Sequence, residues 1–370
     1  KKLLDEPWAW TALNDVRTVE NDAGGEDYVR AITNIAGMRH IDRVVGLDEV
    51  DVVTAARARE HLQLGGMTYS HAVRFRDKFA MRNIADEAGI PCPEFICPLN
   101  PAQIDEFLDR VPAPWIVKPR HEVSAFGIRK CETKEQVWDV LNDLDNRNNW
   151  RDHPSQFLIE RFIEGDVFHV DSVVHDGKVV AAGVSRYGRP PFSVSHYGGV
   201  FTTSIVEYGS KERKELEKLN TKLLKAFKYE EGVTHGEFLR GKDDGKFYLL
   251  EVACRVGGAY IANVLDNACG FNLWREWAKL SVADKEHPYE KPKVRKEYAG
   301  VALALAKEEE PDTLHYTDPE IVYRIKKPKH VGLIFHSPDK QRVDDLLEEY
   351  TRRISDDFLA VAPAKERYDD

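Results

Sequence analysis

The sequence has 370 residues, of which 42% are hydrophobic and 31% are charged, and its formal net charge is −10. This length and apolar content predict two or three subdomains with cores of their own, and they exclude a disordered chain or one small module. The negative charge, the lack of a long basic run and the lack of an apolar run of roughly 20 residues argue against nucleic acid and membranes as partners.

The cysteines favour a reducing compartment. Their number is odd and no two have the spacing of a Cys-x-x-Cys metal or redox motif; they are Cys92, Cys97, Cys131, Cys254 and Cys269. We therefore expect reduced thiols and a cytoplasmic protein rather than a disulfide framework or a zinc site.

In chain order, the first part of the sequence is predicted to be an α/β layer. Residues 43–47 (Arg-Val-Val-Gly-Leu) have the pattern of a short buried strand, and residues 50–64 have helical apolar spacing. Residues 77–88 form a second predicted amphipathic helix, for which Asp77 is a plausible N-cap.

The rest of the chain alternates strand and helix patterns. Strands are predicted at 115–119, 157–162, 299–306, 320–325 and 331–336, with a hairpin in residues 166–182 around Asp176-Gly177. Helices are predicted at 134–144, 211–228, 273–280 and 339–354.

A second predicted hairpin, residues 235–258, carries charges in otherwise apolar strands. If its loop spans Lys242–Lys246, Glu237 and Glu251 face each other with Cβ atoms about 5 Å apart. Two such carboxylates repel unless a proton or cation lies between them, and facing hard oxygens suit Mg²⁺, which often also binds substrate phosphates. Because strand side chains alternate, Arg255 shares the face of Glu251. From the hairpin alone, a surface pair of glutamates with a nearby arginine is an equally good interpretation.

Two further segments could serve a nucleotide. Lys118 ends an apolar strand just before Ser124-Ala-Phe-Gly127, a small-residue loop whose backbone N–H groups could contact phosphates. Glu160 closes another apolar strand, where its carboxylate, next to a free backbone edge, could accept a hydrogen bond from an adenine amine. Taken singly, each side chain is more often a solvated charge at the end of a strand.

Together, these segments resemble the ATP-grasp superfamily over about residues 40–280. The resemblance rests on their order: Asp77-Lys78, Val117-Lys118-Pro119, the small loop, Glu160-Arg-Phe-Ile-Glu-Gly, Glu237, and Glu251-x-x-x-Arg255-x-Gly257-Gly258. It implies an α/β chain with an α+β ATP-grasp fold. The expected domains are an N-terminal α/β layer at 1–75, the ATP-grasp domain at 76–290 with a lid at about 112–163, and a small C-terminal α+β subdomain at 291–370. Because the family opens with a β-α-β unit, we expect N-terminal residues to be missing before Lys1.

The resemblance also implies roles for single residues. ATP phosphates would be bound by Lys78, Lys118 and the flap from Ser124 to Gly127, and the adenine by Glu160, Arg161 and Phe162. A Mg²⁺ or Mn²⁺ ion would be held by Glu237 and Glu251. The acyl phosphate would be bound by Arg255. The chain departs from the family at Ala253, where most members have a metal-binding Asn, and near Val167, where many have a ribose-binding Glu.

His235-x-Glu237 followed by Glu251-Val-Ala-x-Arg-x-Gly-Gly looks most like the carboxylate–amine ligases of the L-amino-acid ligase type. Such enzymes use ATP to convert a carboxylate to an acyl phosphate, which an amine then attacks. The implied partners are small carboxylates and amines, and homodimers are common in such families. The resemblance places a substrate pocket at 185–199, where Arg186 or Arg189 could clamp a carboxylate, His196 could relay a proton, and Gly198 and Gly199 could line the pocket. A carboxylase-type subunit that uses bicarbonate, and a nucleotide-binding protein without catalysis, remain as alternatives.

Overall fold

The computed structural model describes residues 9–20, 24–122, 127–148, 156–191, 194 and 198–361. The chain divides into two compact units, Lys1–Arg74 and Phe75–Asp370. In these described stretches, no helix combines the length and the apolar character that crossing a bilayer requires.

The described part of the first unit is helical. Its elements are η2 (Trp10–Ala12), α1 (Gly25–Ala36), η3 (Glu49–Asp51), α2 (Val52–His61) and α3 (Tyr69–Val73). The helix predicted at 50–64 is thus confirmed, but the strand predicted at 43–47 is wrong, and Val45 and Leu47 are 39% and 52% exposed. No strand lies among the residues described in this unit, so the segment has no neighbour with which to form a ladder. Its Val44 carbonyl instead accepts a hydrogen bond from Arg59 at 2.7 Å.

The second unit begins with α4 (Lys78–Glu87), which Asp77 caps as predicted by accepting hydrogen bonds from Phe79 N and Ala80 N. A small antiparallel sheet follows in the order β1-β4-β2-β3. Its strands are β1 (Phe95–Ile96), β2 (Trp115–Pro119), β3 (Arg129–Cys131) and β4 (Phe157–Arg161).

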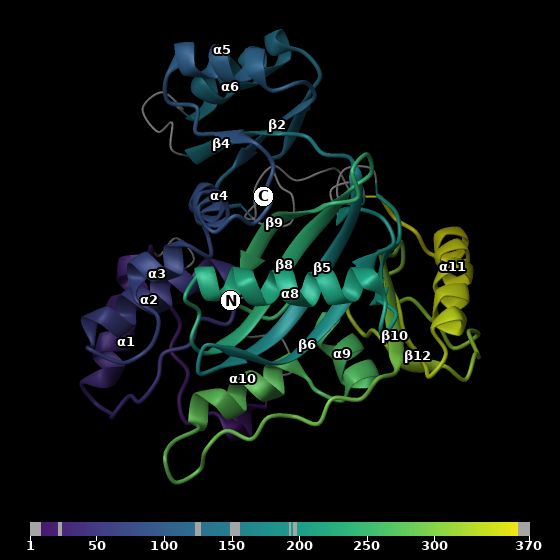
Figure 1. The fold of residues 1–370 in the computed structure, drawn as a ribbon. Coiled ribbons are helices and arrows are strands. Elements are labelled where there is room, and N and C mark those ends of the chain that lie inside the picture. Colours follow the sequence, from purple (N-terminus) through teal and green to yellow (C-terminus); the bar gives the residue numbers. More distant parts are fainter. Residues whose placement is uncertain are drawn as a thin grey trace. The chain divides into compact units, whose positions relative to one another are not determined.

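One face of the small sheet is covered by α5 (Pro101–Arg110) and α6 (Lys134–Asn148), which lie above β2 and β4 in Figure 1. Both helices pack against the side chains of Trp115 and Val117. Because side chains alternate along β2, Lys118 points to the opposite face of the sheet.

An eight-stranded antiparallel sheet forms most of the second unit. Its strands, in spatial order, are β11 (Ile321–Arg324), β12 (His330–Ser337), β10 (Tyr298–Leu305), β7 (Phe201–Ile205), β6 (Lys178–Tyr187), β5 (Gly165–His175), β8 (Gly232–Gly241) and β9 (Phe247–Ala253). Both predicted hairpins are confirmed, as β5–β6 and β8–β9. Strands β10 to β12, from the part of the chain after residue 290, extend this sheet.

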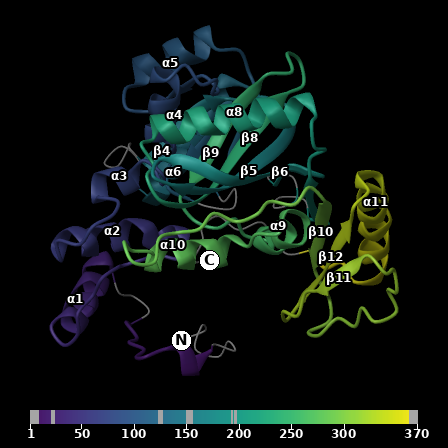
Figure 2. The same ribbon diagram turned by 60° about the horizontal axis from the view of Figure 1, so that its bottom comes forward.

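Helices cover both faces of the large sheet. On one face lie α8 (Lys211–Ala226), which bonds to Ser172 of β5 through Asn220, and α11 (Lys340–Asp357), which packs on β10 and β12. On the other face lie α9 (Ile261–Cys269) and α10 (Leu273–Val282), whose apolar side chains pack on Val173 and Val301. Figure 2 shows the strands β5, β6, β8 and β9 between α8 on one side and α9 and α10 on the other.

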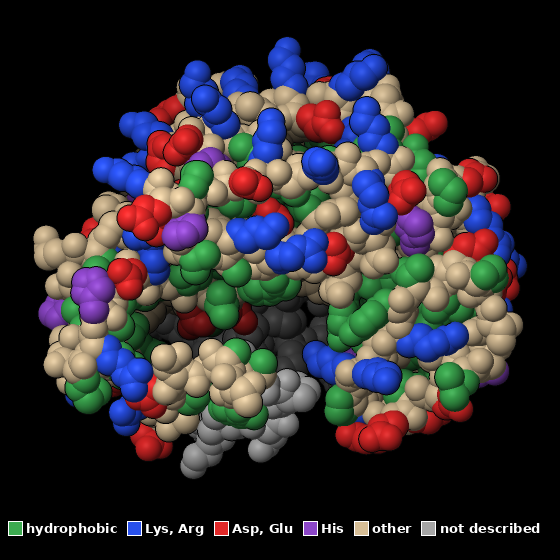
Figure 3. Space-filling view, turned by 90° about the horizontal axis from the view of Figure 1, so that it is seen from below, with side chains coloured by type: hydrophobic (Ala, Val, Ile, Leu, Met, Phe, Trp, Pro, Cys, Tyr) green, Lys and Arg blue, Asp and Glu red, His purple; other side chains and the backbone are tan. Residues whose placement is uncertain are grey.

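The surface carries both signs of charge. On the face drawn in Figure 3, basic and acidic side chains are interspersed. Exposed ion pairs of the surface include Lys242–Glu164 and Arg110–Glu94, and each such pair contributes less than about 1 kcal/mol to stability.

Candidate functional site

The β8–β9 hairpin brings the two predicted carboxylates together. Glu237 and Glu251 pair directly across the strands, as predicted. Nearer the turn the register differs by one residue from the predicted one, because Phe238 pairs with Leu249 and Leu250 forms a bulge. The bulge restores the pairing at Glu237, so the facing carboxylates depend on a feature that the sequence pattern did not indicate.

Glu251 lies among cations. Its Oε2 is 3.0 Å from Nζ of Lys78, at the start of α4, and this ammonium also donates to the Glu122 carbonyl at 2.7 Å. Burial alone would raise the pKa of the Glu251 carboxyl, but the charges of Lys78, Arg255 and Lys118 lower it to about 2. The carboxylate is therefore ionised at neutral pH, and three of the predicted cationic residues act on it.

Lys118 and Glu160 form a buried ion pair on the face of the small sheet opposite α5 and α6. Glu160 also accepts hydrogen bonds from Arg82 of α4 at 2.9 and 3.1 Å, so both of its oxygens are bonded. Burial raises the pKa of the Glu160 carboxyl, but the two cations lower it below its usual range. Burial lowers the pKa of the Lys118 ammonium to about 8, although Glu160 opposes this shift.

The surroundings of Glu160 correct one expectation. The strand that carries it, β4, has neighbours on both sides, so Glu160 does not border a free backbone edge. The N–H groups of Arg161 and Phe162, predicted to contact adenine, donate to Glu94 O at 2.8 Å and Pro114 O at 2.9 Å. Adenine could therefore contact the backbone of Arg161 and Phe162 only through their carbonyl groups, or by replacing the hydrogen bonds that their N–H groups make here.

Glu237 is hydrogen-bonded to the side chain of Tyr187, whose hydroxyl donates to Oε1 of Glu237 at 2.6 Å. Nε2 of His235 lies 3.4 Å from the same oxygen. Burial and the charge of Glu237 raise the pKa of Tyr187 far above its usual value, so the hydroxyl remains a donor.

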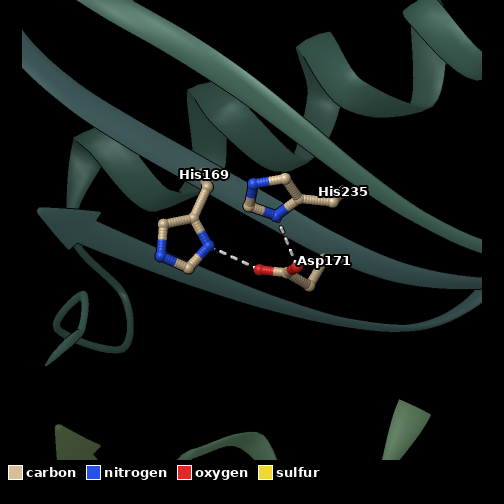
Figure 4. Close-up of side chains that lie close together, drawn as sticks. All are labelled: His169, Asp171 and His235. Atoms are coloured by element: carbon tan, nitrogen blue, oxygen red, sulfur yellow. Dashed lines mark hydrogen bonds and ion pairs between the residues drawn. The ribbon is translucent and has the colours of Figure 1, made fainter. Parts of the chain in front are cut away.

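Behind Glu237 lies a buried cluster that the sequence analysis missed. The carboxylate of Asp171 accepts a hydrogen bond from Nδ1 of His235 at 2.8 Å and one from Nδ1 of His169 at 2.5 Å, and Figure 4 shows it between the two rings. Burial lowers the pKa of His235, but Asp171 outweighs burial and raises it to about 10. The signal in the sequence is a pair of polar residues two apart in the apolar strand β5, which places both on one face.

Arg255 lies in the segment after β9, where Nη1 donates to the Val256 carbonyl at 2.9 Å. The same segment passes close to the buried cluster. A Cβ on Gly257 would lie 2.8 Å from Nδ1 of His235 and 2.9 Å from Oδ1 of Asp171, so this approach requires glycine. The cluster thus lies against both Glu237 and the segment that carries Arg255.

Arg186, predicted to clamp a substrate, is not at this site. Arg186 pairs with Phe168, whereas the neighbouring Ser185 pairs with His169, which in turn pairs with Glu237. Alternation therefore puts Arg186 on the opposite face of the sheet, where it is 2.9 Å from Asp166 and lines a groove of about 730 Å³. Arg186 therefore does not join Glu237 and Glu251, because its face is set by the register of its strand with β5, which a local sequence pattern does not show. Its role in binding a substrate carboxylate stays a prediction.

The remaining predicted residues lie elsewhere or outside the described chain. The guanidinium of Arg189 lies against Gly199, and Gly198 lies against Val361. Gly127 is in a turn with a φ of 66°, which favours glycine. Ser124 and His196 lie outside the described residues.

The assembled side chains fit a metal-bound polyphosphate. In the part of the chain that the structure describes, Oε2 of Glu237 has no hydrogen bond or ion pair, and Glu251 is ionised beside it. Carboxylate oxygens of this kind suit Mg²⁺, and Lys78, Lys118 and Arg255 supply the cationic groups that phosphate oxygens need.

Comparisons with known proteins agree with this geometry. Residues 111–263 match the model of an ATP-grasp domain. The chain is 24% identical over 242 residues to an L-arginine-specific L-amino acid ligase of Bacillus subtilis, which covers 65% of this chain and 58% of that protein. It thus spans less than two thirds of that relative's length.

Solved structures show the same fold. An L-amino acid ligase from Bacillus licheniformis superposes with a TM-score of 0.70 at 18% identity, over 91% of this chain and 85% of that one. The biotin carboxylase domain dimer of the Hydrogenobacter thermophilus 2-oxoglutarate carboxylase, in complex with MgADP, gives 0.69 at 14% identity, over 92% and 80%. The predicted α+β ATP-grasp fold is thereby confirmed, and this chain contains an ATP-grasp domain.

Proposed function

We propose that this protein is an ATP-dependent carboxylate–amine ligase that joins two amino-acid-like substrates through an acyl phosphate and releases ADP and phosphate. The observation that carries the proposal is the assembly of two facing carboxylates with three cations on one side of the large sheet. The similarity to an L-arginine-specific L-amino acid ligase supports amino acids as the substrate class.

The residues divide into phosphate, metal and base contacts. Lys78 and Lys118, with the flap from Ser124 to Gly127, would bind ATP phosphates, and Glu160 would accept from the adenine amine. Glu237 and Glu251 would hold Mg²⁺, or Mn²⁺ in its place. The bound metal would neutralise phosphate charge and fix the orientation of the phosphate oxygens.

The chemistry requires alignment and charge neutralisation more than covalent help. A carboxylate oxygen attacks the γ-phosphorus, and the bond from that phosphorus to the oxygen of ADP breaks. The amine nitrogen then attacks the carbonyl carbon, the bond from that carbon to the phosphate oxygen breaks, and the nitrogen loses a proton. Arg255, which acts electrostatically on Glu251, would stabilise the negative charge of the acyl phosphate and of the oxyanion.

Release of ADP and phosphate from MgATP tests the proposal, with amino acids offered singly and in pairs and bicarbonate as a separate arm. Release is expected to need two amino acids. It should fall by about 100-fold or more in Glu251→Gln, the loss typical of a group that stabilises charge in the transition state.

Glu94→Gln is the matched control, because Glu94 forms an exposed ion pair with Arg110 at 2.6 Å, and this variant should retain activity. Release driven by bicarbonate alone would replace the ligase with a carboxylase-type subunit. An ATP-binding protein without release in any arm would contradict both and favour nucleotide binding without catalysis.

A further inference from the structure

Glu237 is held through one of its two oxygens. The Tyr187 hydroxyl and Nε2 of His235 both face Oε1, at 2.6 and 3.4 Å. No hydrogen bond or ion pair from a described residue reaches Oε2. Two groups on one oxygen restrict the rotation of the carboxylate, and they leave the other oxygen available to a ligand.

The His235 ring is fixed in turn by Asp171, which accepts its Nδ1–H at 2.8 Å. The second oxygen of Asp171 is bonded to His169, and Nε2 of His169 lies 2.7 Å from the Thr203 hydroxyl. These side chains come from β5, β7 and β8, and all of them are buried. A continuous hydrogen-bonded network therefore leads from the interior of the sheet to Oε1 of Glu237. Figure 4 shows its central part, the two hydrogen bonds that join His169, Asp171 and His235.

A metal ion within the cluster is the competing interpretation. His169, Asp171 and His235 offer ligand atoms that lie within 4.8 Å of one another. However, Nδ1 of each ring is already bonded to Asp171, and Nε2 of each ring faces another polar group. Hydrogen bonds account for every ring nitrogen, so the cluster needs no ion.

We propose that Asp171, His235 and Tyr187 are positioning residues for Glu237. Asp171 orients the His235 ring, and His235 and Tyr187 together hold Oε1 so that Oε2 faces the metal ion. The inference rests on the proposed function, because it takes Glu237 as a magnesium ligand. Groups that orient a metal-binding side chain in this way typically contribute about 10- to 100-fold to metal affinity.

Binding of Mn²⁺ to the folded protein with ADP present, measured by electron paramagnetic resonance of the free ion, tests the inference without turnover. Asp171→Asn keeps the size of the side chain but replaces one acceptor oxygen by a donor, so it cannot accept from both rings. Tyr187→Phe removes only the hydroxyl. Each change is expected to weaken Mn²⁺ binding about 10-fold or more while metal-free ADP binding is retained.

Ser172→Ala is the matched control. Ser172 is equally buried on the same strand, but its hydrogen bond, from Asn220 at 2.9 Å, lies on the opposite face of the sheet. This variant should lower stability and leave Mn²⁺ affinity unchanged. If Asp171→Asn does not fold, Tyr187→Phe, the smaller change, decides.

Glu237→Gln separates this inference from the function on which it rests. If Glu237→Gln does not weaken Mn²⁺ binding, the proposed metal site fails and the inference fails with it. If Glu237→Gln weakens binding while folded Asp171→Asn and Tyr187→Phe do not, only the inference is overturned. An ion that binds Glu237→Gln as tightly as the parent but is lost in Asp171→Asn would also overturn it, since the ion would then lie on the Asp171 cluster.

Discussion

Lys118 is a lysine whose titration should govern nucleotide binding. Burial lowers its pKa to about 8, so in the free protein the ammonium loses its charge as the pH rises through that value. Below this pH the charged ammonium attracts the phosphates of ATP. Above it, ATP binding must be accompanied by protonation of Lys118. ATP affinity is therefore expected to fall above about pH 8, by up to about 10-fold per pH unit, in calorimetric titrations.

Lys118→Arg provides the control for this pH dependence. Arginine remains charged over the whole range, so the variant should show ATP affinity that is nearly independent of pH. A fall of the same size in the variant would assign the effect to another group.

Gly257 and Gly258 are adjacent in sequence but differ in their surroundings. A Cβ on Gly257 would meet the ring of His235 and the carboxylate of Asp171 at under 3 Å, whereas a Cβ on Gly258 would have no heavy atom of the described residues within 4 Å, apart from its chain neighbours. Gly257→Ala is expected to lower the free energy of unfolding by about 1–3 kcal/mol, as in other overpacked sites, and Gly258→Ala by less than about 0.5 kcal/mol. Urea denaturation measures both, and equal losses would mean that the close approach carries no cost.

At the scale of elements, the N-terminus of α4 allows a prediction about both stability and ATP binding. Asp77 caps this helix and also pairs with Arg120, so Asp77→Ala removes a cap and leaves a largely buried guanidinium without its carboxylate. The expected loss of stability is about 3 kcal/mol or more, with weaker ATP binding because Lys78 is the first residue of α4.

The N-cap of α5 is the matched control for Asp77. Asn100 accepts hydrogen bonds from two backbone N–H groups in the same way, but its side chain is exposed and uncharged. Asn100→Ala should cost only about 1 kcal/mol and leave ATP binding unchanged. Thermal unfolding with and without nucleotide separates the two outcomes, and similar losses would show that the ion pair of Asp77 adds nothing.

The elements that sequence reasoning found are those with a local pattern. Alternation and a central polar turn were enough for the β8–β9 hairpin, and helical spacing was enough for α2, α4 and α8. The strand predicted at 43–47 failed because a strand needs a neighbour, which a local pattern does not supply. Helix α5 was missed although Asn100-Pro101 is a start signal in the sequence.

Sequence reasoning predicted the part of the candidate site that lies within a single hairpin, β8–β9. Glu237 and Glu251 belong to the same hairpin, so its turn was enough to bring them close together, although their direct pairing also depends on the bulge at Leu250. His169 and Asp171 were missed because they meet His235 only through the pairing of β5 with β8, which are separated by more than 50 residues. The position of Arg186 on the face opposite Glu237 could not be predicted for the same reason, since the face on which a strand residue lies depends on the register of the strand with its neighbours.

For the second unit as a whole, a buried charge cluster joins the small sheet, α4 and the large sheet. Arg82 of α4 bonds both to Glu160 of the small sheet and, at 2.8 Å, to the Leu250 carbonyl of the large sheet. Lys78 and Lys118 add two further cations, against the two carboxylates of Glu160 and Glu251. This excess of positive charge favours an anionic ligand between the two sheets.

Glu160→Gln tests how much of this connection depends on charge. The change leaves Arg82 and Lys118 buried without their carboxylate, and breaking a buried ion pair in this way costs about 3–5 kcal/mol.

Glu94→Gln makes the same chemical change in an exposed pair, 2.6 Å from Arg110, where the cost should stay below about 1 kcal/mol. Both values follow from chemical denaturation of the two variants beside the parent protein. Because the substitutions are identical and differ only in burial, a clearly larger loss for Glu160 would assign the joining of the two sheets to the buried charges. Equal losses would instead assign it to the apolar contacts around them.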